Sequence, residues 1–532
     1  MSGGAATARL AAADAPPLTA RTLIGFFAMA FGMFMAILDI QIVSASLAEI
    51  QAGLSASQDE ITWVQTSYLI AEVVMIPLSG YLSRLLSTRL LFVISASSFT
   101  VMSLLCATST SIEEMMIFRA LQGFLGGAMI PTVVAGSYIM FGQGRAAGIS
   151  VIVGLVATLA PTIGPTVGGY LTHALSWHWL FLINVPIGIA ITITVWSLVD
   201  LDKPNWKLLQ GFDFAGLALM AVFLGSVEYV LEEGARKNWF EDETIEMLTV
   251  VSVIAAAGFF LRVLSAKNPI VNLRVFRDRN FSLGTSYGFI LGIGLYGLVY
   301  LMPAFLGRVR GYNSLQIGEM LFITGMCQFI AAPIAGLLAR RFDTRFVLVG
   351  GLSMMAISSY MLSFVTSDWS FNEFLLPQIL RGAGLMFCMV PANVIAMSAQ
   401  SGDQLKDASG LYNLMRNLGG ALGLAVLNTQ LTDRLAFHYE RLSESVSAGR
   451  AVAEDALAGL TARFSDLMPG DAATGALKTL SGFVRQQAAT MAFADCFLLV
   501  AIIYALAIFT VPLLGKPRHL ARAEEFELLE PA

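Results

Sequence analysis

Long apolar runs recur along the whole chain, and each is close to the roughly 20 residues that a helix needs to cross the hydrocarbon core of a bilayer. Fourteen runs can be placed, at 22–47, 61–82, 90–107, 115–141, 146–171, 179–199, 212–230, 245–264, 281–305, 315–338, 346–365, 371–397, 408–427 and 489–514. Charged residues make up only 13% of the chain, against about 25% in ordinary soluble domains. The sequence therefore predicts an all-α polytopic protein whose fourteen crossings are surrounded by the lipid bilayer.

Basic residues indicate the orientation of these crossings, because cytoplasmic loops are enriched in Lys and Arg. They fall in alternate short connections and near the C-terminus, whereas 49–62 and 108–115 on the opposite side contain none. We expect both termini to be cytoplasmic in a multi-pass protein of the inner membrane. The long mixed-charge segment 432–487 is predicted to be an external loop. The formal net charge of −5 gives no reason to expect a nucleic-acid partner.

A short internal repeat divides the chain into halves. Residues 80–89 (GYLSRLLSTR) and 336–345 (GLLARRFDTR) keep glycine, leucine, threonine and two arginines in register, each after the second crossing of its half. Parallel halves are typical of transporters in which one half rocks against the other around a midplane site. The predicted organisation is a cytoplasmic tail (1–21), an N-terminal six-helix bundle (22–200), two inserted transmembrane helices (201–266), a basic cytoplasmic linker (267–280), a C-terminal six-helix bundle (281–514) and a second cytoplasmic tail (515–532).

Glycine and proline are concentrated in 160–169 (APTIGPTVGG), inside the fifth apolar run. Gly164 and Gly168 are four residues apart, so they share one helix face and let a second helix approach closely. Pro161 and Pro165 each remove a backbone N–H, which adds a bend at the same place. From this pattern alone, a kinked packing helix is an open alternative to a functional element.

Acidic residues inside apolar runs are candidates for function, because a charge at that depth is costly unless it is paired or hydrated. Asp39 lies about two thirds of the way along the first run, and Arg119 in the fourth run is its natural counter-charge. Glu72 lies midway in the second run, and either a role in protonation or cation contact or a structural hydrogen bond fits it. Glu228, near the end of the seventh run, is interpreted as an interface residue. A static ion pair that fixes helix packing stays open for Asp39 and Arg119.

Several short motifs stand in an order shared with one group of transporters: 38–43 (LDIQIV), 63–68 (WVQTSY), 76–80 (IPLSG), 119–123 (RALQG), 164–169 (GPTVGG), 179–188 (WLFLINVPIG) and 416–420 (RNLGG). Over residues 22–515 the chain resembles the fourteen-helix drug:proton antiporters of the EmrB/QacA type, within the major facilitator superfamily. It departs from the wider superfamily at Arg84, where an acidic residue is usual, and at Ser87, where glycine is usual.

The resemblance implies a major facilitator fold of two six-helix bundles plus two inserted linker helices, and proton-coupled efflux of amphipathic drugs by alternating access. It implies proton coupling at Asp39 and Arg119, with Glu72 as a second candidate. The antiporter motif would be formed by Gly164, Pro165, Gly168 and Gly169. The gating loops would contain Gly80, Arg84, Arg89, Gly336, Arg340 and Arg345, although basic residues there also fit a purely topological role. A substrate cavity is expected at Met35, Tyr68, Gln122, Tyr296 and Tyr300.

Partners and substrate follow only from this resemblance. EmrB-type pumps work with a periplasmic membrane-fusion adaptor and an outer-membrane channel, QacA-type pumps work with neither, and the first-half motifs are closer to the EmrB type. Export or import of one metabolite, such as a siderophore or a fatty acid, fits the same scaffold. The sequence has no H-E-x-x-H and no G-x-x-x-x-G-K motif. We therefore expect no enzyme, no cofactor and no metal, with the proton gradient as the energy source.

Overall fold

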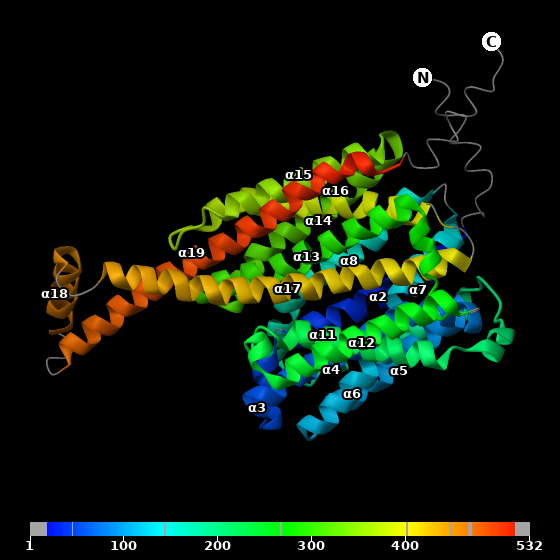
Figure 1. Ribbon diagram of the computed structural model, residues 1–532, viewed down its shortest axis with the longest axis horizontal. Coiled ribbons are helices and arrows are strands. Elements are labelled where there is room, and N and C mark those ends of the chain that lie inside the picture. The colour runs from blue at the N-terminus through cyan, green and yellow to red at the C-terminus, as the bar shows by residue number, and fades with distance from the viewer. Residues whose placement is uncertain are drawn as a thin grey trace, which may run out of the picture.

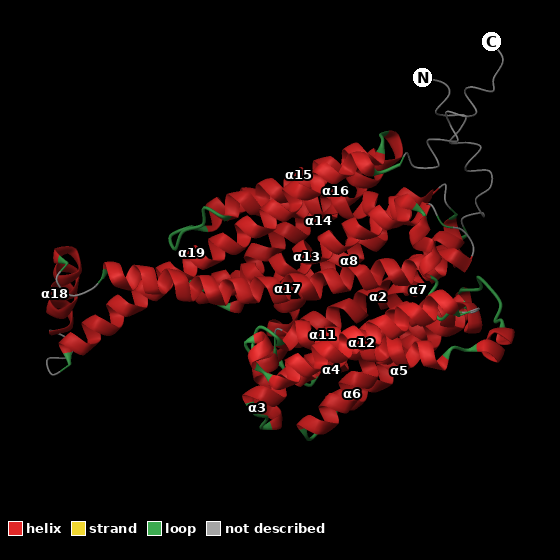
Figure 2. Ribbon diagram, in the orientation of Figure 1, coloured by secondary structure: helices red, strands yellow, loops and turns green. Residues whose placement is uncertain are grey.

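The computed structural model describes residues 19–515, apart from 45, 143–144, 267–268, 399, 401–402, 447–449 and 466–470. Across these residues the regular structure is entirely helical (Figure 2). The predicted tails 1–21 and 515–532 lie almost wholly outside the described residues. An all-helical chain is what an apolar environment demands, because each helix satisfies its own backbone N–H and C=O groups.

Helices of the N-terminal half are α2 (Ala20–Ser44), α3 (Leu47–Leu54), α4 (Gln58–Leu86), α5 (Thr88–Ala107), α6 (Ile112–Gly126), α7 (Met129–Phe141), α8 (Ala146–Ala174), α9 (Trp179–Leu182) and α10 (Asn184–Leu198). The inserted pair is α11 (Phe214–Glu233) and α12 (Glu243–Ser265). Helices of the C-terminal half are α13 (Arg279–Arg308), α14 (Ser314–Arg341), α15 (Thr344–Leu362), α16 (Phe371–Ser398), α17 (Asp403–Ser445), α18 (Ala451–Ser465) and α19 (Ala472–Thr510).

Thirteen helical segments in the described part of the chain are long and apolar enough to cross a membrane, and each overlaps a run predicted from the sequence. The remaining predicted crossing, 408–427, lies inside α17, a helix of 43 residues. Its hydropathy is lowered by Asn413, Arg416 and Asn417, of which Asn413 and Arg416 are buried. α17 therefore directs polar side chains into the protein rather than toward lipid.

Two helical bundles pack against each other along a few helices. In the N-terminal bundle α4 packs on α6 and α2 on α8, while in the C-terminal bundle α13 packs on α17 and α15 on α16. The bundles meet where α8 contacts α14 and α16, and where α17 contacts α4 and α7. In Figure 1 the C-terminal helices α13 to α16 lie above α17, and α4, α5 and α6 lie below it. This arrangement places α4, α8 and α17 at the surface between the bundles.

The inserted pair docks mainly on the N-terminal bundle, because α11 packs along α4 as well as on α12. The rings of Trp63 and Tyr229 lie 5.4 Å apart between these helices, and the Thr66 hydroxyl donates a hydrogen bond to Glu233 at 3.3 Å. Trp239, just after α11, donates its indole N–H to Thr429 of α17 at 2.8 Å. The pair therefore spans from one bundle to the other.

The segment 432–487, predicted from the sequence to be a loop, is instead helical over most of its length. α17 continues to Ser445, α18 follows, and α19 begins at Ala472. The segment is rich in alanine and in charged residues, and alanine and most charged residues favour helix even without an apolar face. α18 lies at the far left of Figure 1, beyond the ends of the bundles.

The Gly/Pro stretch lies in the continuous helix α8, which contains both Pro161 and Pro165. A side chain at Gly168 would place its Cβ 2.7 Å from the Ile42 carbonyl oxygen of α2. A Cβ at Gly164 would likewise collide with Gln41 of α2. The two glycines therefore share the face that packs on α2, as their spacing predicts, while Pro165 and Gly169 are half-buried beside them.

Enlarging this glycine face should destabilise the N-terminal bundle. Gly168→Ala introduces an overpacked contact, for which a cost of about 1–3 kcal/mol is expected. The matched control is Gly148→Ala in the same helix, where a Cβ meets nothing within 4 Å. Thermal unfolding of the detergent-solubilised protein should show a lower Tm for Gly168→Ala alone; equal Tm values for the two variants would contradict the packing described here.

Candidate functional site

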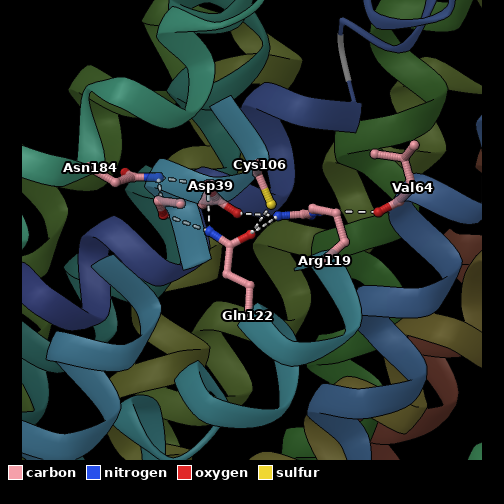
Figure 3. Close-up of polar contacts among 7 residues, drawn as sticks. Asp39, Val64, Cys106, Arg119, Gln122 and Asn184 are labelled. Atoms are coloured by element: carbon pink, nitrogen blue, oxygen red, sulfur yellow. Dashed lines mark hydrogen bonds and ion pairs between the residues drawn. The ribbon is translucent and has the colours of Figure 1, made fainter. Parts of the chain in front are cut away.

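A buried ion pair lies at the centre of the N-terminal bundle (Figure 3). Arg119 Nη1 of α6 lies 2.6 Å from Asp39 Oδ2 of α2, and both side chains are fully buried. The pair predicted from the sequence as the proton-coupling candidate is therefore in direct contact. Taking two charges out of water is costly, so such a pair persists only when further hydrogen bonds satisfy both groups.

Two polar side chains, Asn184 and Gln122, supply those hydrogen bonds. Asn184 of α10 donates to Asp39 Oδ1 at 2.7 Å, and Gln122 of α6 donates to the same oxygen at 3.5 Å. Gln122 also accepts from Arg119 at 2.7 Å and donates to Ser103 of α5 at 2.7 Å. Both carboxylate oxygens of Asp39 are therefore engaged.

The guanidinium of Arg119 is held against α4. Its Nε donates to the Val64 carbonyl at 3.0 Å, and its carbon lies 4.3 Å from the centroid of the Tyr68 ring. Its second terminal nitrogen, Nη2, and the Tyr68 hydroxyl have no hydrogen-bond partner among the described residues. Arg119 therefore has a free donor and a polar neighbour toward which it can shift if Asp39 ceases to attract it.

Gln122, one of the residues predicted to line a cavity, is a member of this charge network. It is fully buried and bonded to Arg119, Asp39 and Ser103. Sequence reasoning assigned no role to Asn184 and did not single out Ser103. Asn184 is the polar residue of the 179–188 motif, and that position was the one signal in the sequence that could have marked it as a site residue. No signal in the sequence marked Ser103, because single serines are common in apolar helices.

The other cavity candidates lie on three different helices. Met35 of α2 and Tyr68 of α4 are buried, whereas Tyr296 and Tyr300 of α13 are half-buried. A Cβ at Gly420 of α17 would collide with the Tyr296 ring, which shows that this ring lies directly on the α17 backbone. The set is therefore split between the core of the N-terminal bundle and the contact of α13 with α17.

Glu72 of α4 is buried, with 2% of its side chain exposed. Within the described residues it forms no hydrogen bond and no ion pair, in contrast to Asp39. It is therefore not a member of the Asp39–Arg119 network, although electrostatic interactions with Asp39, Arg119 and Arg416 reach it.

The first of the two repeated loops bridges the bundles. Arg84 Nη2 lies 3.2 Å from Asp407 Oδ1 of α17, and a Cβ at Gly80 would lie 2.9 Å from the same oxygen. Lys406 donates to the Ser83 carbonyl at 3.2 Å and pairs with Asp202. We call Arg84, Asp407, Lys406 and Asp202 the interbundle latch.

The second repeated loop makes no equivalent contact. Arg340 is exposed and forms no ion pair within the described part of the chain, and Arg345 lies 3.9 Å from Asp343 of its own loop. Gly336 is buried in α14. Arg89 of the first loop also stays within its own half, 3.8 Å from Asp200. Of the six residues predicted for the gating loops, only Gly80 and Arg84 reach the opposite bundle.

These features define a class of protein. Two helical bundles carry a charge pair buried at membrane depth, and an ionic latch joins the bundles at one end, which is the construction of a multi-pass membrane transporter. The chain matches the family model of the Major Facilitator Superfamily over residues 29–424, and it belongs to that superfamily.

Two relatives are similar over most of their length. The chain is 42% identical to the colistin resistance protein EmrB of Acinetobacter baumannii, over 90% of this chain and 93% of that protein. It is 30% identical to the multidrug export protein EmrB of Escherichia coli (strain K12), over 80% and 84%. The crystal structure of the human organic anion transporter MFSD10 (TETRAN) has the same fold, with a TM-score of 0.57 at 15% identity, covering 92% of this chain and 100% of that one.

Breaking the latch should open the surface between the bundles at that end. Ser409 of α17 is buried there and donates to the Pro131 carbonyl of α7 at 2.7 Å. In a background that lacks the four native cysteines, a Ser409→Cys probe should react with a maleimide about fivefold faster when Arg84→Gln is added, for a lost ion pair of roughly 1 kcal/mol. The control is Arg340→Gln, which removes the exposed arginine of the other repeat. Equal labelling of the two variants would mean that the Arg84 pair does not hold the bundles together.

Proposed function

We propose that the protein exports amphipathic toxic compounds across the inner membrane, by alternating access and in exchange for protons. The main observation in support is the Asp39–Arg119 pair, whose two ionisable side chains are fully buried in one bundle of a two-bundle transporter. An ionisable residue at membrane depth is a functional candidate in itself. The resistance and export activities named for the two EmrB relatives support drugs as the cargo.

In this mechanism Asp39 is the proton carrier. A proton on Asp39 removes the charge that holds Arg119, so the guanidinium is left with its bonds to Gln122 and Val64. Leaving it in place would keep an unpaired charge buried, at a cost of about 3–5 kcal/mol. That cost favours a shift of Arg119 within the bundle, using its free Nη2 donor.

Helix α4 would carry this change to the surface between the bundles. Val64 and Tyr68 of α4 hold Arg119, and Gly80 and Arg84 of the same helix contact Asp407. One continuous helix therefore joins the proton site to the latch. Since the positive-inside rule assigns the latch to the cytoplasmic face, its closure corresponds to a state open to the outside.

The adaptor-linked arrangement is part of the same proposal. The helical projection formed by the end of α17, α18 and the start of α19 lies on the side that the topology assigns to the exterior. It offers a place for a periplasmic membrane-fusion adaptor, which would pass the cargo to an outer-membrane channel. Deleting the adaptor should then remove resistance, and unchanged resistance would contradict a three-part pump.

Neutralising Asp39 should abolish gradient-driven export. We expect Asp39→Asn to reduce efflux of a fluorescent lipophilic dye to the rate seen for the wild type with a protonophore, because the variant cannot exchange a proton. Arg119→Ala should have the same effect. The control is Asp368→Asn, an exposed acid in the loop between α15 and α16.

Because Asp39→Asn leaves Arg119 buried without its partner, the double variant Asp39→Asn/Arg119→Gln tests folding separately. It removes both charges, so it should insert and unfold like the wild type while remaining inactive. Full efflux in either single variant would contradict the assignment of Asp39. A wild type that moves no dye would reject drug export and favour a transporter of one metabolite.

A further inference from the structure

Two of the buried acids outside the Asp39–Arg119 network have no ion-pair partner among the described residues. Glu72 of α4 and Glu228 of α11 have 2% and 6% of their side chains exposed. Within the described part of the chain neither makes a hydrogen bond or an ion pair. Buried carboxylates are normally bonded or paired, so these two are open to a partner that the described residues do not supply.

The packing of α11 on α4 brings both acids to one seam between these helices. A Cβ at Gly225 of α11 would lie 3.4 Å from Ile70 of α4, and Tyr229 stacks near Trp63 at 5.4 Å. Glu228 lies between Gly225 and Tyr229 in sequence, and electrostatic interaction with Glu72 reaches it. The two carboxylates therefore belong to one local environment.

This seam faces the C-terminal bundle. Tyr296 of α13 interacts electrostatically with Glu72, Glu228 and Arg416, and α11 contacts α17 directly. Tyr68 of α4 also interacts with Glu72, and its buried hydroxyl has no hydrogen-bond partner in the described part of the chain. The acids thus lie where α4 and α11 meet α13 and α17, at the boundary across which the bundles move.

The charges at this boundary do not balance. Asp39 is neutralised by Arg119, and Glu233 by Arg236. Arg416 is the nearby cation that forms no ion pair in the described residues, and its Nε has no hydrogen-bond partner. It can offset one of the two carboxylates, while half-buried Glu232 adds further negative charge. With both carboxyl groups ionised, one negative charge would have no partner among the described residues, and a cation of single charge would neutralise it.

We propose that Glu72 and Glu228 bind the positively charged group of a transported organic cation, with the rings of Tyr68 and Tyr296 beside it. Aromatic rings next to carboxylates suit such groups, because a ring face attracts a poorly hydrated cation. The inference rests on the proposed export function and names a substrate class for it. The proposal also gives the inserted helices α11 and α12 a direct part in substrate recognition, because Glu228 lies in α11.

The test is binding of tetraphenylphosphonium to the purified full-length protein in detergent, measured by equilibrium dialysis of the radiolabelled cation. Glu72→Gln and Glu228→Gln should each weaken binding by about tenfold or more, because each removes a buried charge that faces the ligand. The matched control is Glu246→Gln, an exposed acid of α12 in the same inserted pair, and its affinity should equal that of the wild type. Glu228→Asp keeps the charge and should lose less affinity than Glu228→Gln.

Binding in detergent needs no gradient, which separates this site from proton coupling. In the Asp39→Asn background, which fails to export dye, Glu228→Gln should weaken binding of the cation by a further factor of about ten or more. Wild-type affinity in Glu228→Gln, with an unchanged Tm, would overturn the proposal. So would a wild type that does not bind tetraphenylphosphonium but exports neutral or anionic dyes, in which case the export function stands. Binding with the expected losses in a protein that exports nothing would uphold the site and reject the function.

Discussion

The contact between Asp39 and Arg119 is the constraint on which the N-terminal bundle depends. Neither charge is tolerable alone at membrane depth, and breaking such a pair costs about 3–5 kcal/mol. Helices α2, α4, α5, α6 and α10 all supply a group to the pair or to its hydrogen-bonded neighbours. Five helices are therefore positioned by one electrostatic requirement. The glycine face of α8 then closes the bundle by letting α8 approach α2.

The membrane-spanning pattern and the central pair could be predicted from the sequence for clear physical reasons. The length of the apolar runs is set by the thickness of the bilayer. An acid and an arginine inside such runs are expected to pair, because an unpaired charge at that depth is costly. The hydrogen-bonding shell could not be predicted as well. Asn184 and Ser103 are uncharged polar residues. Nothing in their spacing along the chain shows that Asn184 bonds to the Asp39 carboxylate or that Ser103 accepts from Asn184 and Gln122.

The two repeated loops show a second limit of sequence reasoning. Their motifs share glycine, leucine, threonine and two arginines in register, but Arg84 meets Asp407 of the opposite bundle while Arg340 meets no acid in the described residues. A sequence repeat indicates a similar local conformation. Which residue each arginine contacts depends on the rest of the fold. The same limit applies to Glu228, interpreted from the sequence as an interface residue. That it is buried with no partner among the described residues becomes visible only once α11 is placed on α4.

Helix α17 has a mechanical consequence. It has 43 residues, which corresponds to about 65 Å at 1.5 Å per residue, and the latch residues Lys406 and Asp407 lie in its first turns. A rigid rod of that length turns a tilt of about 10° at one end into a sweep of roughly 11 Å at the other. Its far end leads to α18, beyond the bundles (Figure 1). α17 thus connects the latch to the region of α18 in one helix, so that a tilt at the latch would displace its far end, and a protein bound to α18 would oppose that displacement.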